Sequence, residues 1–193
     1  MVKSNNLKVK NGIIFKLKQM KTAIIKKRLL VFLMLLGMVN GYSQISKAEI
    51  VATGLTCSMC SNAINKQLNR MPEVEKVAID LNTNTFTVSL KKGNHITPQA
   101  LRTNIEKAGF FVGSMILTMD ADNVQLKDNA SFKNPSGTYV FVEPKEKLVN
   151  GTLRLKVLNN GFVTKKEYKQ SAKVLTKYSG FGTQEETYFV KTL

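Results

Sequence analysis

Gly54-Leu55-Thr56-Cys57-Ser58-Met59-Cys60 is the stretch that decides the fold, and it holds both cysteines of the chain. The two cysteines stand three positions apart, where the apolar, strand-like run Ile50-Val51-Ala52 gives way to a helix-like segment. At such a turn the N-terminal dipole of the helix favours thiolate over thiol. Two converging thiolates suit a soft ion of low coordination number, Cu(I) above all. The stretch therefore predicts a metal site at the start of a helix.

Outward from this stretch, the sequence pattern predicts the order strand, helix, strand, strand, helix, strand. Met71-Pro72 ends the first helix, because proline keeps the preceding residue out of helical geometry. Thr97 is a good N-cap for the second helix, Pro98 suits its first position and Gly109 suits its C-terminal cap. The expected fold class is α+β, with a ferredoxin-like βαββαβ domain of two helices on a four-stranded antiparallel sheet. The expected strands are 45–53, 77–81, 86–90 and 110–119, with a hairpin turn at 82–85 between the second and third. The expected helices are 58–70 and a second one capped at residues 97 and 109.

Residues 48–114 resemble the heavy-metal-associated domain family of copper chaperones, copper-transporting ATPase modules and the periplasmic mercury-binding protein. The resemblance rests on residues 54–60, on Met71 to Val77 and on Ile105 to Phe110. Leu55 replaces the methionine common in the family, and Glu73 stands where the family often has glycine. The resemblance implies that Cys57 and Cys60 bind one metal ion. It also implies that Phe110 packs near the site and shields the thiolates.

Other fates of the cysteine pair stay open at this point. In an oxidising compartment the pair could form a disulfide, or exchange disulfides as thioredoxin-like proteins do. Zn(II) and Hg(II) are alternatives to Cu(I), although a closed zinc site normally needs four ligands. His95, the one histidine, falls in an expected loop and is interpreted as solvated. Met59 could supply a thioether ligand, whereas Met115 and Met119 share a strand face and are interpreted as core.

The N-terminal residues 1–43 are typical of a secretory signal peptide. Four basic residues between Met20 and Arg28 precede an apolar run, Leu29 to Val39, that is too short to span a bilayer, and small residues follow it. Cleavage before Gln44 is the prediction, and Met20 is the simpler start site. We therefore expect an exported protein of the periplasm or cell envelope, with no stable membrane span after cleavage.

Composition argues against two function classes. Residues 1–43 hold nine Lys and Arg and no acid, so the formal charge falls from +16 to about +7 once they are removed. With no basic stripe interleaved with aromatics, we expect no nucleic-acid partner. One histidine makes most catalytic triads hard to assemble, and we expect no enzymatic activity.

After residue 119 the chain changes character, because residues 120–129 are polar and turn-rich. We expect a boundary there, giving domains at 44–119 and 120–193, the second β-rich and of unknown role. Its expected strands include 138–142, 153–157 and 187–193, with a hairpin signal at Asn159-Asn160-Gly161. The segment 165–176 fits either a helix or a polar strand.

Together these patterns predict an exported protein that binds Cu(I) through Cys57 and Cys60 for trafficking or sequestration. Its expected partner is a metal donor or acceptor protein with a dithiol site. The alternatives are a periplasmic thiol–disulfide protein, or an envelope adaptor whose first domain senses metal. The oligomeric state is open.

Overall fold

The structure is a computed structural model that describes residues 44–55, 58–182 and 186–193, all within one compact unit. The predicted signal peptide therefore lies outside the described residues. Among the helices that the structure describes, none is long and apolar enough to cross a membrane.

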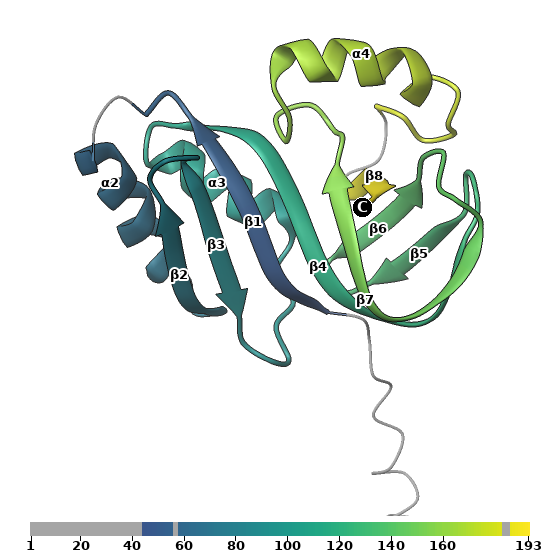
Figure 1. Cartoon of the computed structure of the whole chain (residues 1–193), viewed down its shortest axis with the longest axis horizontal. Coiled ribbons are helices and arrows are strands. Elements are labelled where there is room, and N and C mark those ends of the chain that lie inside the picture. The colour runs from purple at the N-terminus through teal and green to yellow at the C-terminus, as the bar shows by residue number, and fades with distance from the viewer. Residues whose placement is uncertain (1–43, 56–57, 183–185) are drawn as a thin grey trace, which may run out of the picture. The chain divides into compact units, whose positions relative to one another are not determined.

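The first half has the predicted order of elements (Figure 1). Its four strands are antiparallel and lie in the spatial order β2-β3-β1-β4, which is the ferredoxin-like arrangement. Helix α2 contacts β2 and α3, and α3 contacts β4. The elements are β1 (Ile45–Thr53), α2 (Ser58–Asn69), β2 (Val74–Asp80), β3 (Thr85–Leu90), α3 (Pro98–Lys107) and β4 (Phe111–Leu126).

The ends of α3 are set by the residues that the sequence singled out. The backbone N–H of Ala100 donates to Oγ1 of Thr97 at 3.1 Å, so Thr97 is the N-cap, and Pro98 opens the helix. Gly109 follows the C-cap residue with a φ of 88°, in the left-handed region that glycine adopts readily. These local predictions are confirmed.

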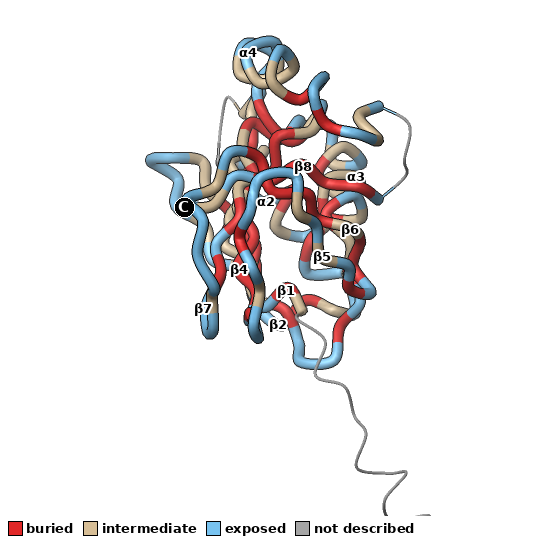
Figure 2. Tube along the Cα trace, turned by 90° about the vertical axis from the view of Figure 1, so that its right-hand side faces the viewer, coloured by how far each residue is buried: buried red, intermediate tan, exposed pale blue. Residues whose placement is uncertain are grey.

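Apolar residues from the helices and the strands form the core of the first half. Ile64, Leu68, Leu101 and Ile105 are fully buried on the two helices. Met115 and Met119 are also fully buried, which confirms them as core residues. Figure 2 shows that the buried stretches follow the strands, whereas α4 is mostly half-buried or exposed.

The second half adds β5 (Ser131–Asn134), β6 (Gly137–Phe141), β7 (Lys147–Val157), α4 (Lys165–Leu175) and β8 (Thr187–Thr192). All eight described strands form one sheet in the order β2-β3-β1-β4-β7-β8-β6-β5. Only the β6–β8 pair is parallel among the described pairs. Of the aromatic residues expected in the core of this half, Phe181 is only half-buried, and the others are buried: Tyr139, Phe141, Phe162, Tyr188 and Phe189.

Strand β4 joins the two halves. It pairs with β1 through Met119 and with β7 from Ile116 to Leu126, so it continues through the expected boundary at residue 119. One core cluster includes residues of both halves, among them Leu68 and Phe141. The linker expected at 120–129 is therefore strand up to Leu126, with a register shift between Ala121 and Val124, where Asn123 has a φ of 52°.

Two local predictions for the second half are resolved by the structure. The hairpin expected at Asn159-Asn160-Gly161 is wrong, because β7 is followed by a turn into α4 rather than by a partner strand. Asn159 instead ties this turn to β8: its side chain donates to the carbonyl of Thr187 at 2.8 Å and accepts from the N–H of Phe189 at 2.7 Å. The ambiguous segment 165–176 is helix α4.

Glu49 on β1 forms ion pairs with residues on either side. Nζ of Lys47 lies 2.7 Å from one carboxylate oxygen, and Nη2 of Arg154 on β7 donates to the other at 2.6 Å. Lys47 foremost, and Arg154 after it, hold the pKa of Glu49 below its usual value, although partial burial acts in the opposite direction. The pair with Arg154 spans β4 and connects the two halves.

Candidate metal site

The cysteine loop lies between the end of β1 at Thr53 and the start of α2 at Ser58. Gly54 opens the loop with a φ of 90°, a conformation that other residues adopt only with strain. Thr56 and Cys57 lie outside the described residues.

Cys60, the second predicted ligand, lies in the first turn of α2 and is half-buried. This turn reads Ser58-Met59-Cys60-Ser61 and carries no acidic residue that would oppose a thiolate. The partial positive charge at the start of the helix stabilises a thiolate there. The position therefore favours the form of cysteine that binds a metal ion.

Apolar residues surround the loop in two ways. A Cβ built on Gly54 would lie 3.8 Å from the ring of Phe110, so this ring reaches the loop as the resemblance implied. Leu55 packs partly against the main core, as expected of a residue that supports the loop from behind. Met59 and Phe111 instead point outward, with exposed fractions of 81% and 66%. The loop thus has an apolar support and an apolar outer rim.

His95 lies at the other end of the sheet from this loop. The side chain of the preceding Asn94 donates to the carbonyl of Ile45, the first residue of β1, whereas the cysteine loop follows Thr53, its last residue. His95 is exposed in the loop between β3 and α3, which confirms its interpretation as a solvated residue. It is the chain's one histidine. A ligand set at the cysteine loop therefore contains no imidazole from this chain.

The described cavities lie elsewhere. Three of them, of about 450 to 550 Å³, are lined mainly by residues of the second half, and the described loop residues Gly54, Leu55 and Cys60 line none of these three. Gly54 and Met59, which stand on either side of the undescribed residues, are exposed.

Comparison with known proteins places this geometry in a family. The family model for the heavy-metal-associated domain matches residues 50–111, which run from the middle of β1 to the start of β4. Residues 50–111 are a heavy-metal-associated domain. The domain contains the Cys-x-x-Cys stretch, α2, β2, β3 and α3, and it is the part of the chain that has the ferredoxin-like order.

Curated relatives of this heavy-metal-associated domain are copper-transport proteins. The copper-exporting P-type ATPase of Staphylococcus saprophyticus is 35% identical over 72 residues, which are 37% of this chain and 9% of the ATPase. The probable copper-transporting ATPase HMA5 of Arabidopsis thaliana is 33% identical over 66 residues, 34% of this chain and 6% of that protein. The chain thus matches less than a tenth of the length of either relative.

Two solved structures that contain the yeast domain Ccc2a are similar to a third of this chain. The yeast copper transporter domain Ccc2a, solved in apo and Cu(I)-loaded states, is 36% identical, and the match covers 33% of this chain and 86% of that domain with a TM-score of 0.31. The structure of the complex of Atx1, Cu(I) and Ccc2a contains a chain that is also 36% identical. That match covers 33% of this chain and 86% of the other, with a TM-score of 0.30.

The place of α4 in the fold could not be predicted from the sequence. Its Lys165-Lys166 start and its further lysines were visible, but a segment that fits either a helix or a strand has no defined face. The outward-pointing Phe111 was likewise hidden within an apolar run. The sheet brings both near the end of β1: Phe111 pairs with Thr53, and a Cβ on Gly113 of β4 would contact both Thr53 and Thr164, the N-cap of α4.

Proposed function

We propose that the chain binds one Cu(I) ion between the thiolates of Cys57 and Cys60 and passes it to the dithiol site of a partner protein. The observation that carries this proposal is a heavy-metal-associated domain whose strand-to-helix loop contains the chain's two cysteines. The copper transporters that this domain resembles support copper as the cargo.

The donor set supports Cu(I) over the alternatives. Thiolates are soft ligands that suit Cu(I), and two of them are enough for an ion that accepts low coordination numbers. A closed Zn(II) site normally takes four ligands, and His95 lies at the opposite end of β1. Hg(II) shares the preference for two thiolates, so it is the competitor to include in the binding test.

Transfer by ligand exchange suits a loop at the surface. A two-coordinate ion accepts an incoming thiolate as a third ligand, after which one of the first two thiolates leaves. Cys60 is half-buried at the start of α2, where the helix dipole stabilises its thiolate while the ion moves. Phe110, whose ring reaches Gly54, keeps water from one side of the loop.

We propose further that the chain is exported and works in the periplasm or cell envelope after removal of residues 1–43. The basic and apolar segments before Gln44 support this part of the proposal. Cell fractionation followed by the intact mass of the recovered protein tests it. A periplasmic protein that begins at Gln44 is expected, and a cytoplasmic protein that keeps residues 20–43 would refute export.

The experiment that tests the binding proposal is a competition titration of the reduced chain against a chromophoric Cu(I) chelator. We expect one equivalent of Cu(I) to be taken from the chelator, and we expect Cys57→Ser and Cys60→Ser each to lose this competition. Met59→Leu is the matched control, because Met59 points to solvent and is not needed as a ligand. If the unaltered chain does not compete for Cu(I) but binds Hg(II) tightly, copper is refuted as the cargo in favour of mercury.

A further inference from the structure

Helix α4 begins beside the end of the sheet that carries the cysteine loop. A Cβ built on Gly113 of β4 would lie 2.5 Å from Cγ2 of Thr53 and 3.9 Å from Cγ2 of Thr164. Thr53 is the last residue of β1 before the loop, and Thr164 is the N-cap of α4, accepting from the N–H of Glu167 at 3.2 Å. The N-cap of α4 is therefore a neighbour of the end of β1, the strand that leads into the loop, although more than 100 residues separate Thr53 from Thr164 in the chain.

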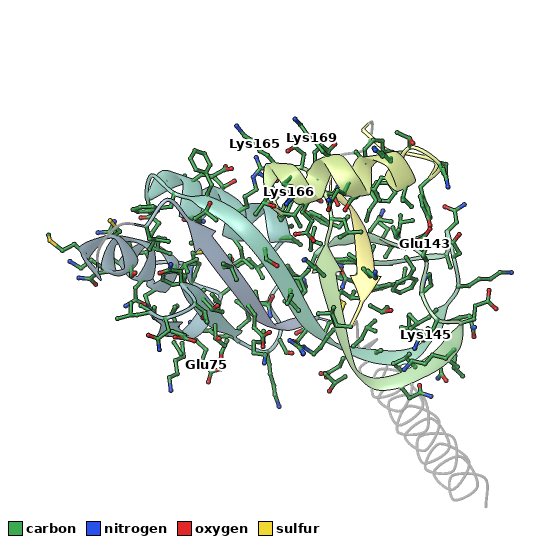
Figure 3. The ribbon with its side chains drawn as sticks, turned by 45° about the horizontal axis from the view of Figure 1, so that its top comes forward. Glu75, Glu143, Lys145, Lys165, Lys166 and Lys169 are labelled. Carbon is green, nitrogen blue, oxygen red and sulfur yellow. The ribbon has the colours of Figure 1, made fainter. Side chains whose placement is uncertain are left out.

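The outer side of this first part of α4 is cationic. Lys165, Lys166 and Lys169 are all exposed, and Figure 3 shows them together at the end of α4 nearer the first half. The single acid of α4, Glu167, forms an ion pair with Lys156 of β7 at 2.5 Å. The charge of Glu167 is therefore compensated by Lys156, and α4 carries no other acidic residue.

The heavy-metal-associated domain itself adds little charge beside the loop. The first turn of α2 is uncharged, and the exposed Phe111 opens β4 next to Thr53, its partner in the register. Lys107 ends α3 and is exposed. Near the end of β1 the described surface thus combines the exposed ring of Phe111 with the lysines at the start of α4.

The position of α4 is fixed by the sheet. Strand β7 occupies the edge of β4, so a partner cannot add a strand there. The Lys156–Glu167 pair holds α4 to β7, and the buried Leu175 packs its far end into a second apolar cluster. The lysines are therefore presented in a constant position relative to β4.

We propose that Lys165, Lys166 and Lys169, together with Phe111, form the docking surface for an acidic, dithiol-containing metal-exchange domain. The inference rests on the proposed function and goes beyond it, because it names the chemistry of the partner and places the recognition on a helix outside the heavy-metal-associated domain. Charge complementarity argues for this occupant: a cationic patch beside a transfer site attracts an acidic surface and raises its rate of encounter.

The test measures the bimolecular rate of Cu(I) transfer from the fully loaded chain to two acceptor probes. One probe is a small dithiol domain with acidic residues around its own Cys-x-x-Cys, and the other is the same domain with these acids replaced by lysine. Lys165, Lys166 and Lys169 are changed together to Glu. The control variant changes three exposed lysines of the second half to Glu with the same change in net charge, namely Lys127, Lys133 and Lys145.

The α4 variant is expected to transfer Cu(I) to the acidic probe about 10-fold more slowly than the unaltered chain. This difference in rate should nearly vanish when the salt concentration is raised from about 0.01 M to about 1 M, because the screening length then falls from about 30 Å to about 3 Å. The same variant should transfer faster than the unaltered chain to the lysine-bearing probe. The control variant should change either rate by less than about 3-fold, since its charges lie away from the loop.

Equal rates for the α4 and control variants with both probes would overturn the proposal. Loss of binding to vesicles of phosphatidylglycerol and phosphatidylcholine, with transfer rates unchanged, would overturn it in favour of a membrane-docking role for the lysines. Each variant is first titrated against the chelator, so that a loss of copper loading is seen separately. If the unaltered chain itself does not load, the proposed function fails and this inference fails with it.

Discussion

The continuous sheet predicts that the two halves of the chain unfold together, and a substitution in α2 tests this. Leu68 is fully buried, belongs to the main core cluster and lies on a helix whose contacts are with β2 and α3. Leu68→Ala removes three carbon atoms and leaves a cavity, at a cost of about 3 kcal/mol in the free energy of unfolding. With a urea dependence of about 2 kcal/mol per M for a chain of this size, the midpoint should fall by about 1.5 M.

Tyrosine fluorescence is the assay, because four of the five tyrosines lie after residue 138 and the chain has no tryptophan. A substitution in α2 should thus move a transition that is observed in the other half. The matched control is Leu81→Ala, since Leu81 is 58% exposed and its loss should move the midpoint by no more than about 0.25 M. The reasoning is refuted if the tyrosine midpoint stays in place while far-UV ellipticity shows a separate, earlier transition.

Three further predictions concern single residues. Gly137→Ala should lower the free energy of unfolding in urea by about 3 kcal/mol, because Gly137 has a φ of 133° and the new Cβ would lie 2.7 Å from a backbone oxygen. The control Gly151→Ala should lower it by about 1 kcal/mol, because Gly151 has a φ of 102° but open space around the new Cβ. Equal losses of stability in the two variants would contradict this prediction. Folding lowers the pKa of Glu49, so the stability that Glu49 contributes is complete above its ordinary pKa and is lost as the pH falls through the lowered pKa. Glu49→Gln should therefore reduce the fall in the thermal unfolding midpoint between about pH 5 and pH 3. The same pH dependence in the variant and the unaltered chain would be evidence against the ion pairs. Burial, and then a hydrogen bond that Tyr178 donates to Asp128, raise the pKa of Tyr178 to about 12. Asp128→Asn should therefore lower the pKa of Tyr178, measured by NMR of labelled tyrosine. An unchanged pKa in this variant would exclude the hydrogen bond.

The sequence predicted those elements whose signals are local. Thr97 with Pro98 and Gly109 bound α3 through capping chemistry that acts within one turn. The turn at 82–85 and the helix after the cysteine pair were found for the same reason. The Cys-x-x-Cys stretch predicted the heavy-metal-associated domain because its spacing and its place between strand and helix are themselves short-range features.

The features that the sequence did not predict depend on distant partners. Polar residues at Asp120 and Asp122 indicated a linker, but β7 pairs with this segment from about 30 residues away and extends β4. The Asn159-Asn160-Gly161 signal is that of a tight turn, yet Gly161 serves a different contact: a Cβ there would lie 2.7 Å from the Arg102 guanidinium of α3. The position of α4 beside the cysteine loop likewise follows from the register of the whole sheet, which no local pattern contains.

In the proposed site, Cys57 and Cys60 together hold one Cu(I) ion. X-ray absorption at the copper edge of the chain loaded with one equivalent tests it most directly, because it reads the oxidation state, the type of ligand atom and their number. The account predicts Cu(I) with two sulfur ligands, and the same spectrum for Met59→Leu. A spectrum dominated by nitrogen or oxygen ligands, or one unchanged in the Cys57→Ser variant, would contradict it.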